Sequence, residues 1–390
     1  MPQPSPYTPG QVAREVPGRH QQLAEIDERL AFMIDLRRLV GRIRVDIGPR
    51  GLGKTSLLRE VQRRADAKGA LTVWVTAGES AGLIGAITNE IERRTAAWSK
   101  DARGTLRNLL DATTITATGG LPGVAQLQAS WSPTENNQLI VAGTREFEGL
   151  VSNTALAASE KQPGGLVLLI DEIQSADPDG LRVLAFAWQH LQVEAPDVPA
   201  AVFSAGLPTS PEIIGAVVTF SERFAYRPIG ALSDEAARIA LARPANRLQV
   251  RWQPEALDAI VHIAQGFPYT LQLFGDATWA AAGYPKPRTE LTVAHVEQAR
   301  IVVSDDLAAL FRARWGKATP AEQVFMAAMA SLGDGPVARG ELAAALGVAS
   351  SELSVPRARL IDKGLIDTAG RGNLVFTIPG FADYVRVHHG

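Results

Sequence analysis

A glycine-rich stretch followed by a lysine and a threonine holds the first residues of this sequence that could do chemistry. In GPRGLGKTS (48–56), four residues separate Gly48 from Gly53, and Lys54 and Thr55 follow directly. Glycines let backbone N–H groups turn inward around phosphate oxygens at the start of a helix. Lys54 would reach the terminal phosphates of a nucleotide, and the Thr55 hydroxyl would bind Mg²⁺. The spacing therefore predicts a nucleoside triphosphate site.

The residues around this loop fit a phosphate-binding turn. GRIRVDI (41–47) alternates and ends in apolar residues, as a strand entering a sheet would. TSLLREVQRRADAKG (55–69) has Leu57, Leu58 and Val61 on one helical face. These flanks disfavour the alternative, a strand-to-helix turn that is rich in glycine by accident. The expected nucleotide contacts of the loop are Gly48, Pro49, Arg50, Gly51, Leu52, Gly53, Lys54, Thr55 and Ser56.

Two consecutive carboxylates follow an apolar run later in the chain. In GGLVLLIDEIQSAD (164–177), the residues from Leu166 to Ile170 are all apolar, and Asp171 and Glu172 come next. Such a run is typical of a strand buried on both faces of a parallel sheet, whose carboxyl end is where such sheets bind ligands. We expect Asp171 to hold Mg²⁺ through water and Glu172 to polarise the attacking water. The alternative is an acidic strand end that faces solvent.

Two further polar residues are candidates for the hydrolytic step. VPAAVFSAGLPTSPE (198–212) predicts another buried strand, which could place Ser204 near the γ-phosphate; an ordinary serine at a strand end is the alternative. Arg223 could be an arginine finger supplied in trans to a neighbouring subunit, where a guanidinium would offset transition-state charge. It could equally form a surface ion pair. The catalytic candidates are thus Glu172, Lys54, Arg223 and Ser204.

Composition narrows the class of protein. The 390 residues are 46% hydrophobic and 21% charged, which suits a globular chain of two or three domains. Because there is no cysteine, disulfides, thiol nucleophiles and cysteine-ligated metal sites are excluded, and a cytoplasmic protein is expected. The net charge of -2 and the lack of a membrane-length apolar run give no global sign of nucleic acid or membrane binding. The guanine-reading Asn-Lys-x-Asp motif is absent, which favours ATP or ADP with Mg²⁺ as the cofactors.

The order of predicted elements gives an α/β fold: a P-loop NTPase core with a parallel sheet, an α-helical lid and a C-terminal winged-helix domain. From Ser233, an expected N-cap, four amphipathic helices follow. Beyond Lys317, a helix-turn-helix and a glycine-rich hairpin predict the winged helix. The expected domains are a proline-rich flexible lead (1–15), an ATPase core (16–231) whose insertion of unassigned role (about 99–163) holds a hairpin around Gly119 and Gly120, a lid (232–303) and a winged helix (304–390).

The predicted winged helix has two possible partners, duplex DNA and protein. The later helix of its helix-turn-helix would enter the major groove. From Lys317 to the end there are seven basic and seven acidic residues, a balance that disfavours phosphate binding unless the charges are segregated. Winged helices also serve as protein-docking modules, so both partners stay open. The candidate DNA contacts are Ser350, Ser351, Ser354, Arg357, Arg359, Lys363 and Arg371.

Over almost its whole length the sequence resembles P-loop ATPases of the AAA+ and STAND type, nearest the origin-recognition-like group with a C-terminal winged helix. GPRGLGKTS and LLIDEIQ look like the two nucleotide motifs of that family, and SERF lies where its arginine finger is expected. VPGRHQQLAEIDERL (16–30) looks like the family's N-terminal segment. This resemblance implies that Val16, Pro17 and Arg19 lie near the adenine.

Two departures from the initiator pattern affect the expected activity. GFPYTLQ (266–272) lacks the arginine that initiator-type lids direct at the γ-phosphate, and its Gly-x-Pro looks like the STAND signature. That likeness implies that Pro268 lies against the nucleotide. The strand ending in FSAG lacks the asparagine of initiator ATPases. Both departures disfavour initiator-style hydrolysis and hexamer-like assembly, and no repeat array of the kind found in typical STAND proteins is detectable.

Together these features predict an ATP-binding, slowly hydrolysing switch that couples nucleotide state to DNA binding or remodelling through a winged helix. One alternative is a STAND-like signalling or defence switch whose winged helix contacts protein, for autoinhibition or oligomerisation. Another is a transcription regulator with ATP as a structural ligand. The expected partners are accordingly duplex DNA, a second copy of the chain through Arg223, or an unknown protein.

Overall fold

The structure, a computed structural model, describes residues 2–78, 82–98, 110, 113, 133–161, 164–220, 223–370 and 372–389. The chain forms two compact units. One comprises Arg19–Ile47 and Leu57–Pro228, and the other comprises Met1–Gly18, Gly48–Ser56 and Ile229–Gly390. The hairpin expected around Gly119 and Gly120 lies outside the described residues.

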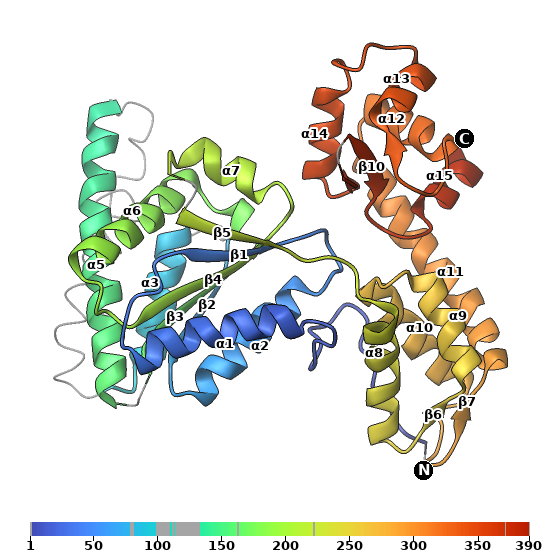
Figure 1. Cartoon of the computed structure of the whole chain (residues 1–390), viewed down its shortest axis with the longest axis horizontal. Coiled ribbons are helices and arrows are strands. Elements are labelled where there is room, and N and C mark those ends of the chain that lie inside the picture. The colour runs from blue at the N-terminus through green and yellow to red at the C-terminus, as the bar shows by residue number, and fades with distance from the viewer. Residues whose placement is uncertain are drawn as a thin grey trace, which may run out of the picture. The chain divides into compact units, whose positions relative to one another are not determined.

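A five-stranded parallel sheet forms the centre of the first unit (Figure 1). Its strands, in the order β2-β3-β4-β1-β5, are β1 (Ile43–Ile47), β2 (Leu71–Thr76), β3 (Leu166–Asp171), β4 (Ala200–Gly206) and β5 (Phe224–Pro228). Every residue of β3 and β4 is buried, which explains their apolar runs. Because all neighbouring strands pair in parallel, the carboxyl ends of β1, β3 and β4 share one edge. The predicted α/β fold is confirmed.

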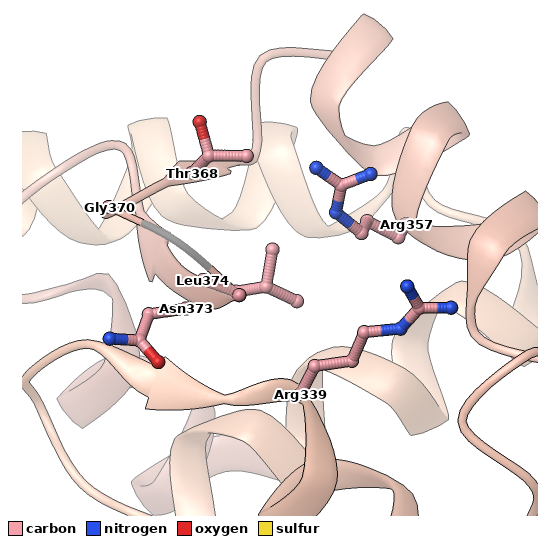
Figure 2. Close-up of a pocket in the computed structure, with 7 residues that line it drawn as sticks. Arg339, Arg357, Thr368, Gly370, Asn373 and Leu374 are labelled. Atoms are coloured by element: carbon pink, nitrogen blue, oxygen red, sulfur yellow. The ribbon is translucent and has the colours of Figure 1, made fainter.

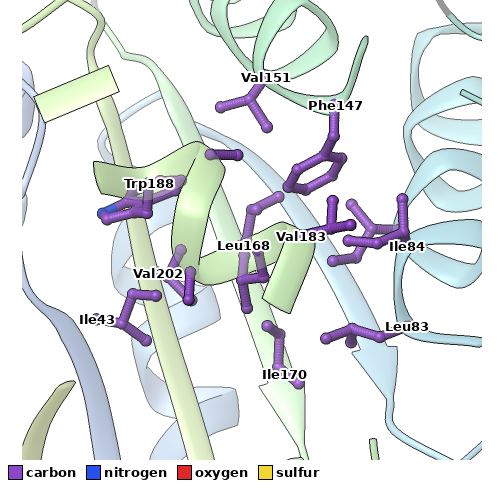
Figure 3. Packing of buried hydrophobic residues seen from close by; sticks show 14 of the residues in the cluster. Ile43, Leu83, Ile84, Phe147, Val151, Leu168, Ile170, Val183, Trp188 and Val202 are labelled. Atoms are coloured by element: carbon purple, nitrogen blue, oxygen red, sulfur yellow. The ribbon is translucent and has the colours of Figure 1, made fainter. Parts of the chain in front are cut away.

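Helices cover both faces of this sheet. On one face, α3 (Gly82–Thr95), α5 (Pro133–Lys161) and α6 (Pro178–Glu194) pack against the strands. Figure 3 shows Leu168 and Val202 of the strands beside Phe147 of α5 and Trp188 of α6. The Trp188 indole N–H also donates to the Val40 carbonyl at 2.9 Å, which fixes α6 to the segment that leads into β1. In Figure 1, α1 (His20–Asp35) and most of α2 (Lys54–Ala67) lie along the other face.

The predicted lid helices form a separate core in the second unit. They are α8 (Asp234–Arg247), α9 (Pro254–Ala264), α10 (Pro268–Ala281) and α11 (Val293–Trp315). Ser233 caps α8, as expected, by accepting the Ala236 backbone N–H. The sequence did not predict the short parallel pairing of β6 (Arg251–Trp252) with β7 (Glu290–Leu291), because two-residue strands carry no periodicity.

The start of the chain is not the flexible lead expected for residues 1–15. Tyr7 is 2% exposed and lies edge-on to both Trp252 and Trp279 of the lid. Its hydroxyl donates to the Leu241 carbonyl at 2.5 Å and accepts the Trp252 indole N–H at 2.9 Å. The Gln3 carbonyl accepts the Trp279 indole N–H at 2.9 Å. The prediction was wrong because a polar, proline-rich composition does not reveal that one aromatic side chain anchors the segment in a core.

The end of the chain has the order of elements of a winged helix. Its helices are α12 (Pro320–Ser331), α13 (Arg339–Leu346) and α14 (Ser354–Asp362), followed by the hairpin strands β9 (Ile366–Thr368) and β10 (Asn373–Phe376). β10 also pairs with β8 (Val337–Ala338), and α15 (Phe381–His389) packs on α12. None of the helices in the described ranges is long and apolar enough to cross a membrane.

We expect Tyr7→Phe to lower the free energy of unfolding by about 1–3 kcal/mol, because it removes the hydrogen bond to the Leu241 carbonyl and leaves the Trp252 indole N–H unpaired in the lid core. Tyr226→Phe is the matched control: its buried hydroxyl has no hydrogen-bond partner in the described part of the chain, so stability should stay the same or rise slightly. Urea denaturation followed by tryptophan fluorescence measures both. Equal losses in the two variants would contradict the anchoring role of Tyr7.

Candidate functional site

The glycine-rich loop leaves the sheet at the end of β1 and leads into α2. Residues 48–53 lie between Ile47, the last residue of β1, and Lys54, the first residue of α2. Gly51 and Gly53 have φ angles of +92° and +85°, in the left-handed region where a side chain would be strained. The predicted strand–loop–helix arrangement is confirmed.

The loop is packed closely, and its lysine is buried against it. A Cβ atom on Gly51 would lie 2.7 Å from the Phe267 ring, so only glycine fits there. Lys54 is 6% exposed, and its Nζ donates to the Pro49 carbonyl at 2.9 Å. This bond holds the ammonium beside the backbone of its own loop. A buried cation at a helix N-terminus favours a phosphate anion.

The acidic pair lies at the carboxyl edge of the sheet. Asp171 is the last residue of β3 and is 7% exposed, and its Oδ1 accepts the Glu172 backbone N–H at 3.0 Å. Glu172 has a φ angle of +52°, which costs a residue with a side chain about 1–2 kcal/mol. Backbone strain of this kind concentrates at functional sites. The chain turns sharply here, directly after the strand.

A glutamine that the sequence interpretation did not single out holds the Glu172 carboxylate. Gln174 Nε2 donates to Glu172 Oε2 at 2.5 Å, and Gln174 Oε1 accepts the Leu207 backbone N–H at 3.0 Å. Leu207 directly follows β4, so the amide bridges the ends of β3 and β4. The close approach requires Gly206, because a Cβ atom there would lie 3.0 Å from Gln174 Oε1 and 2.2 Å from Ser210 Oγ. The available signal was a polar residue two positions after the acidic pair.

A buried ion cluster lies on β1, just before the loop. Arg44 is fully buried and Asp46 is 2% exposed, and Arg44 Nη2 lies 2.8 Å from Asp46 Oδ1. Arg44 also contacts Glu25 of α1 at 2.8 Å, and Glu25 contacts Arg227 of β5 at 3.0 Å. Burial raises the pKa of Asp46 although Arg44 acts against it. Desolvation acts to raise the pKa of Glu25, but Arg227 and Arg44 outweigh it and lower that pKa.

The residues expected near the adenine lie around the start of α1. Arg19 directly precedes α1 and is 6% exposed; burial lowers the pKa of its guanidinium, and the Asp46 charge opposes this effect. Val16 and Pro17 are half-buried. Gly18, with a φ angle of +74°, approaches α8 so closely that a Cβ atom would lie 2.5 Å from the Ala236 Cβ. Their contact with adenine stays a prediction.

Ser204 serves the sheet instead of a ligand. It is fully buried in β4, and its hydroxyl donates to the Arg44 carbonyl of β1 at 2.8 Å. Since a serine hydroxyl has one proton to donate, the expected contact with the γ-phosphate is replaced by this bond between strands. Arg223 Nη1 donates to Gln192 Oε1 of α6 at 2.9 Å. Its action in trans stays a prediction.

The Gly-x-Pro segment of the lid turns tightly into α10. Gly266 has a φ angle of +71°, and a Cβ atom there would lie 2.0 Å from the Leu232 carbonyl oxygen. Phe267 is buried, and Pro268 is the first residue of α10, where its missing N–H leaves no hydrogen bond unmade. Because Phe267 packs on Gly51, this segment lies beside the glycine-rich loop. Contact of Pro268 with a nucleotide stays a prediction.

The candidate DNA contacts divide by burial and partner. Ser350, Ser351, Ser354 and Arg359 are exposed. Lys363 is different, because its ammonium pairs with Glu322, which is 2% exposed, so this lysine stabilises the domain interior. Arg371 lies outside the described residues.

A parallel sheet with a glycine loop after β1 and an acidic pair after β3 defines the P-loop NTPase class. Residues 15–199 match the AAA ATPase domain family, and the resemblance to AAA+ P-loop ATPases is confirmed. Residues 308–385 match a domain of unknown function (DUF8462). No curated protein sequence matches the chain.

Two solved structures share the fold over nearly the whole chain. The ORC2 protein of Aeropyrum pernix, solved as ADPNP–ADP complexes, is 15% identical with a TM-score of 0.60, and the match covers 98% of this chain and 95% of that one. A Walker-type ATPase of Pyrococcus abyssi is 12% identical with a TM-score of 0.56, and the match covers 96% and 99%. At these identities the likeness establishes an origin-recognition-like fold.

The two residues expected to hold Mg²⁺ are of suitable chemical types, and their joint binding of the ion stays a prediction. Within the ranges that the structure describes, no three His, Cys, Asp or Glu side chains cluster as metal ligands. Mg²⁺ commonly binds one or two protein groups, several waters and the substrate phosphates. The Thr55 hydroxyl and the Asp171 carboxylate are hard oxygen ligands suited to this role.

Lys54→Ala should weaken ADP and ATP binding roughly 10- to 100-fold, because a charge-assisted hydrogen bond to phosphate contributes about 1.5–3 kcal/mol. Lys68→Ala is the matched control, since Lys68 is exposed just beyond the last residue of α2. Isothermal titration of both variants measures the affinities. Binding by Lys54→Ala at the wild-type affinity would contradict the assignment of this loop.

Proposed function

We propose that this chain binds ATP with Mg²⁺ and hydrolyses it, and that nucleotide state controls DNA binding by its winged helix. The observation that carries the hydrolytic part is the Glu172 carboxylate, which Gln174 orients at the carboxyl edge of the sheet. A carboxylate in a fixed position can polarise a water for in-line attack on a phosphate. The structure that contains ADPNP and ADP has the same fold, which supports a nucleotide ligand here.

Each residue has a separate role in this proposal. The loop N–H groups and Lys54 hold the phosphates, and Thr55 and Asp171 hold Mg²⁺, which supplies charge neutralisation at the phosphates. Glu172 draws a proton from the attacking water, and Gln174 keeps its carboxylate in one orientation. Arg223, released from Gln192, acts on the nucleotide of a neighbouring subunit.

The second candidate is a STAND-like switch whose winged helix contacts protein. The Gly-x-Pro turn favours it, because Gly266 and Phe267 bring the start of α10 to the phosphate loop without an arginine. A Gly-x-Pro segment that offers no arginine to the γ-phosphate suits slow turnover and long-lived nucleotide states. Steady-state ATP hydrolysis with and without duplex DNA separates the two candidates, because only the turnover of a DNA-coupled ATPase changes when duplex is added.

Glu172→Gln should reduce steady-state ATP hydrolysis at least 100-fold, because the amide cannot accept the proton of the attacking water. Glu212→Gln, an exposed residue on α7 (Ser210–Val217), is the matched control and should keep wild-type turnover. Duplex DNA should raise wild-type turnover and leave Glu172→Gln inactive. Turnover that ignores DNA, together with no DNA binding in ATP or ADP, would favour the protein-partnered switch.

Gln174→Glu should shift the acid limb of the kcat–pH profile to higher pH, because two adjacent carboxylates resist being ionised together and the active form needs Glu172 ionised. Gln174→Met removes both hydrogen bonds without adding charge, so it should lower kcat and shift the acid limb less than Gln174→Glu does. Fixed-time assays of ATP hydrolysis between about pH 5 and 9 measure the kcat–pH profiles of both variants. An unshifted acid limb in Gln174→Glu would show that residue 174 does not act on Glu172.

A further inference from the structure

A cleft in the winged helix has two arginines on one side and the wing hairpin on the other (Figure 2). Arg339 begins α13 and Arg357 lies in α14, while Thr368 ends β9 and Asn373 begins β10. The buried Leu374 lies between the two sides. The cavity measures about 340 Å³, near the lower end of the sizes of small-ligand sites.

Arg339 is held in place and still has donors to offer. Its Nε donates to the Ser350 carbonyl at 3.0 Å, and its Nη2 donates to Ser354 Oγ at 2.8 Å. The Nη1 group makes no hydrogen bond with any residue that the structure describes. The guanidinium is therefore oriented by its partners with one N–H₂ group available to a ligand.

Arg357 faces the cleft without a bonded partner. Its guanidinium has no hydrogen bond or ion pair within the described chain. The Asp367 carboxylate interacts electrostatically with Arg357. Burial raises the pKa of Asp367, and the Arg357 charge acts against that effect. Asp367 also accepts the Thr368 backbone N–H at 2.7 Å. A single half-buried carboxylate offsets the two arginines only in part.

The basic side chains of this domain differ in whether a carboxylate pairs with them. Two of them are used internally: Lys363 pairs with Glu322, and Arg386 pairs with Asp334 and Asp383. Arg339, Arg357 and Arg359, which lie on α13 and α14, form no carboxylate ion pair among the described residues. Two of these arginines line the cleft, where their guanidinium groups are available to a phosphate.

We infer that the cleft holds one phosphate of a nucleic acid backbone between Arg339 and Arg357, with Thr368 and Asn373 donating from the hairpin. Guanidinium groups match phosphate oxygens in charge and fork geometry. The inference rests on the proposed DNA binding and adds a contact that positions the duplex without reading its sequence. Arg339, Thr368 and Asn373 had no sequence signal for this role.

The test measures duplex affinity by fluorescence anisotropy between about 50 and 200 mM salt, for wild type, Arg339→Ala, Arg357→Ala and the double variant, on two unrelated duplexes. Each single variant should lose affinity about tenfold on both duplexes, and the slope of log K against log salt should fall by about 1. In the double variant the slope of log K against log salt should also fall by about 1, because both arginines contact the same phosphate. Lys317→Ala removes an exposed charge outside the cleft and should keep the wild-type slope.

Several outcomes would overturn the inference. Wild-type affinity and slope in Arg357→Ala, which breaks no internal hydrogen bond, would overturn it while leaving the proposed DNA binding intact. A fall of about 2 in the slope of log K against log salt in the double variant would mean that the two arginines contact two separate phosphates. Inorganic phosphate that binds wild type but not Arg357→Ala, with equal duplex affinities, would assign the cleft to a free anion. No duplex binding by wild type would overturn both proposals together.

Discussion

Parallel pairing of β3, β4 and β1 is the constraint on which the rest of the molecule depends. Because β4 lies between the other two strands, the chain reaches the same edge of the sheet at Ile47, at Asp171 and at Gly206. The glycine loop starts there after β1, and the acidic pair is placed there by β3. Strands paired in parallel must be covered on both faces, which accounts for the apolar runs and for the helices on either side.

That sheet also contains charges, which is unusual for a strand covered on both faces. Arg44 and Asp46 lie two residues apart on β1, so their side chains share one face, where α1 contributes Glu25. Desolvating such ions is costly, and losing one partner from a buried pair costs about 3–5 kcal/mol. The cluster therefore ties α1 and β5 to the strand that carries the phosphate loop, and it demands one arrangement of the three elements.

The role of each polar side chain near the carboxyl edge depends on the groups that it bonds to. Ser204 and Gln174 are both polar residues close to a strand end, yet one bonds the Arg44 carbonyl inside the sheet and the other bonds Glu172 and the Leu207 N–H. Only the second can influence chemistry at the edge. In the winged helix, Arg339 and Arg357 keep N–H groups without internal partners among the described residues, and these groups can bind an external anion.

The sequence by itself determined the nucleotide motifs, the lid helices and the winged helix, because spacing and periodicity encode local structure. Lys54 and Asp171 were identifiable since the residues beside them specify a loop and a buried strand. Only the tertiary structure decided that Tyr7 is buried between two tryptophans, that Ser204 serves the sheet and that Gln174 holds Glu172. The physical reason is that the partner of a buried polar or aromatic group comes from a segment distant in the chain, and no local pattern specifies which segment folds against it.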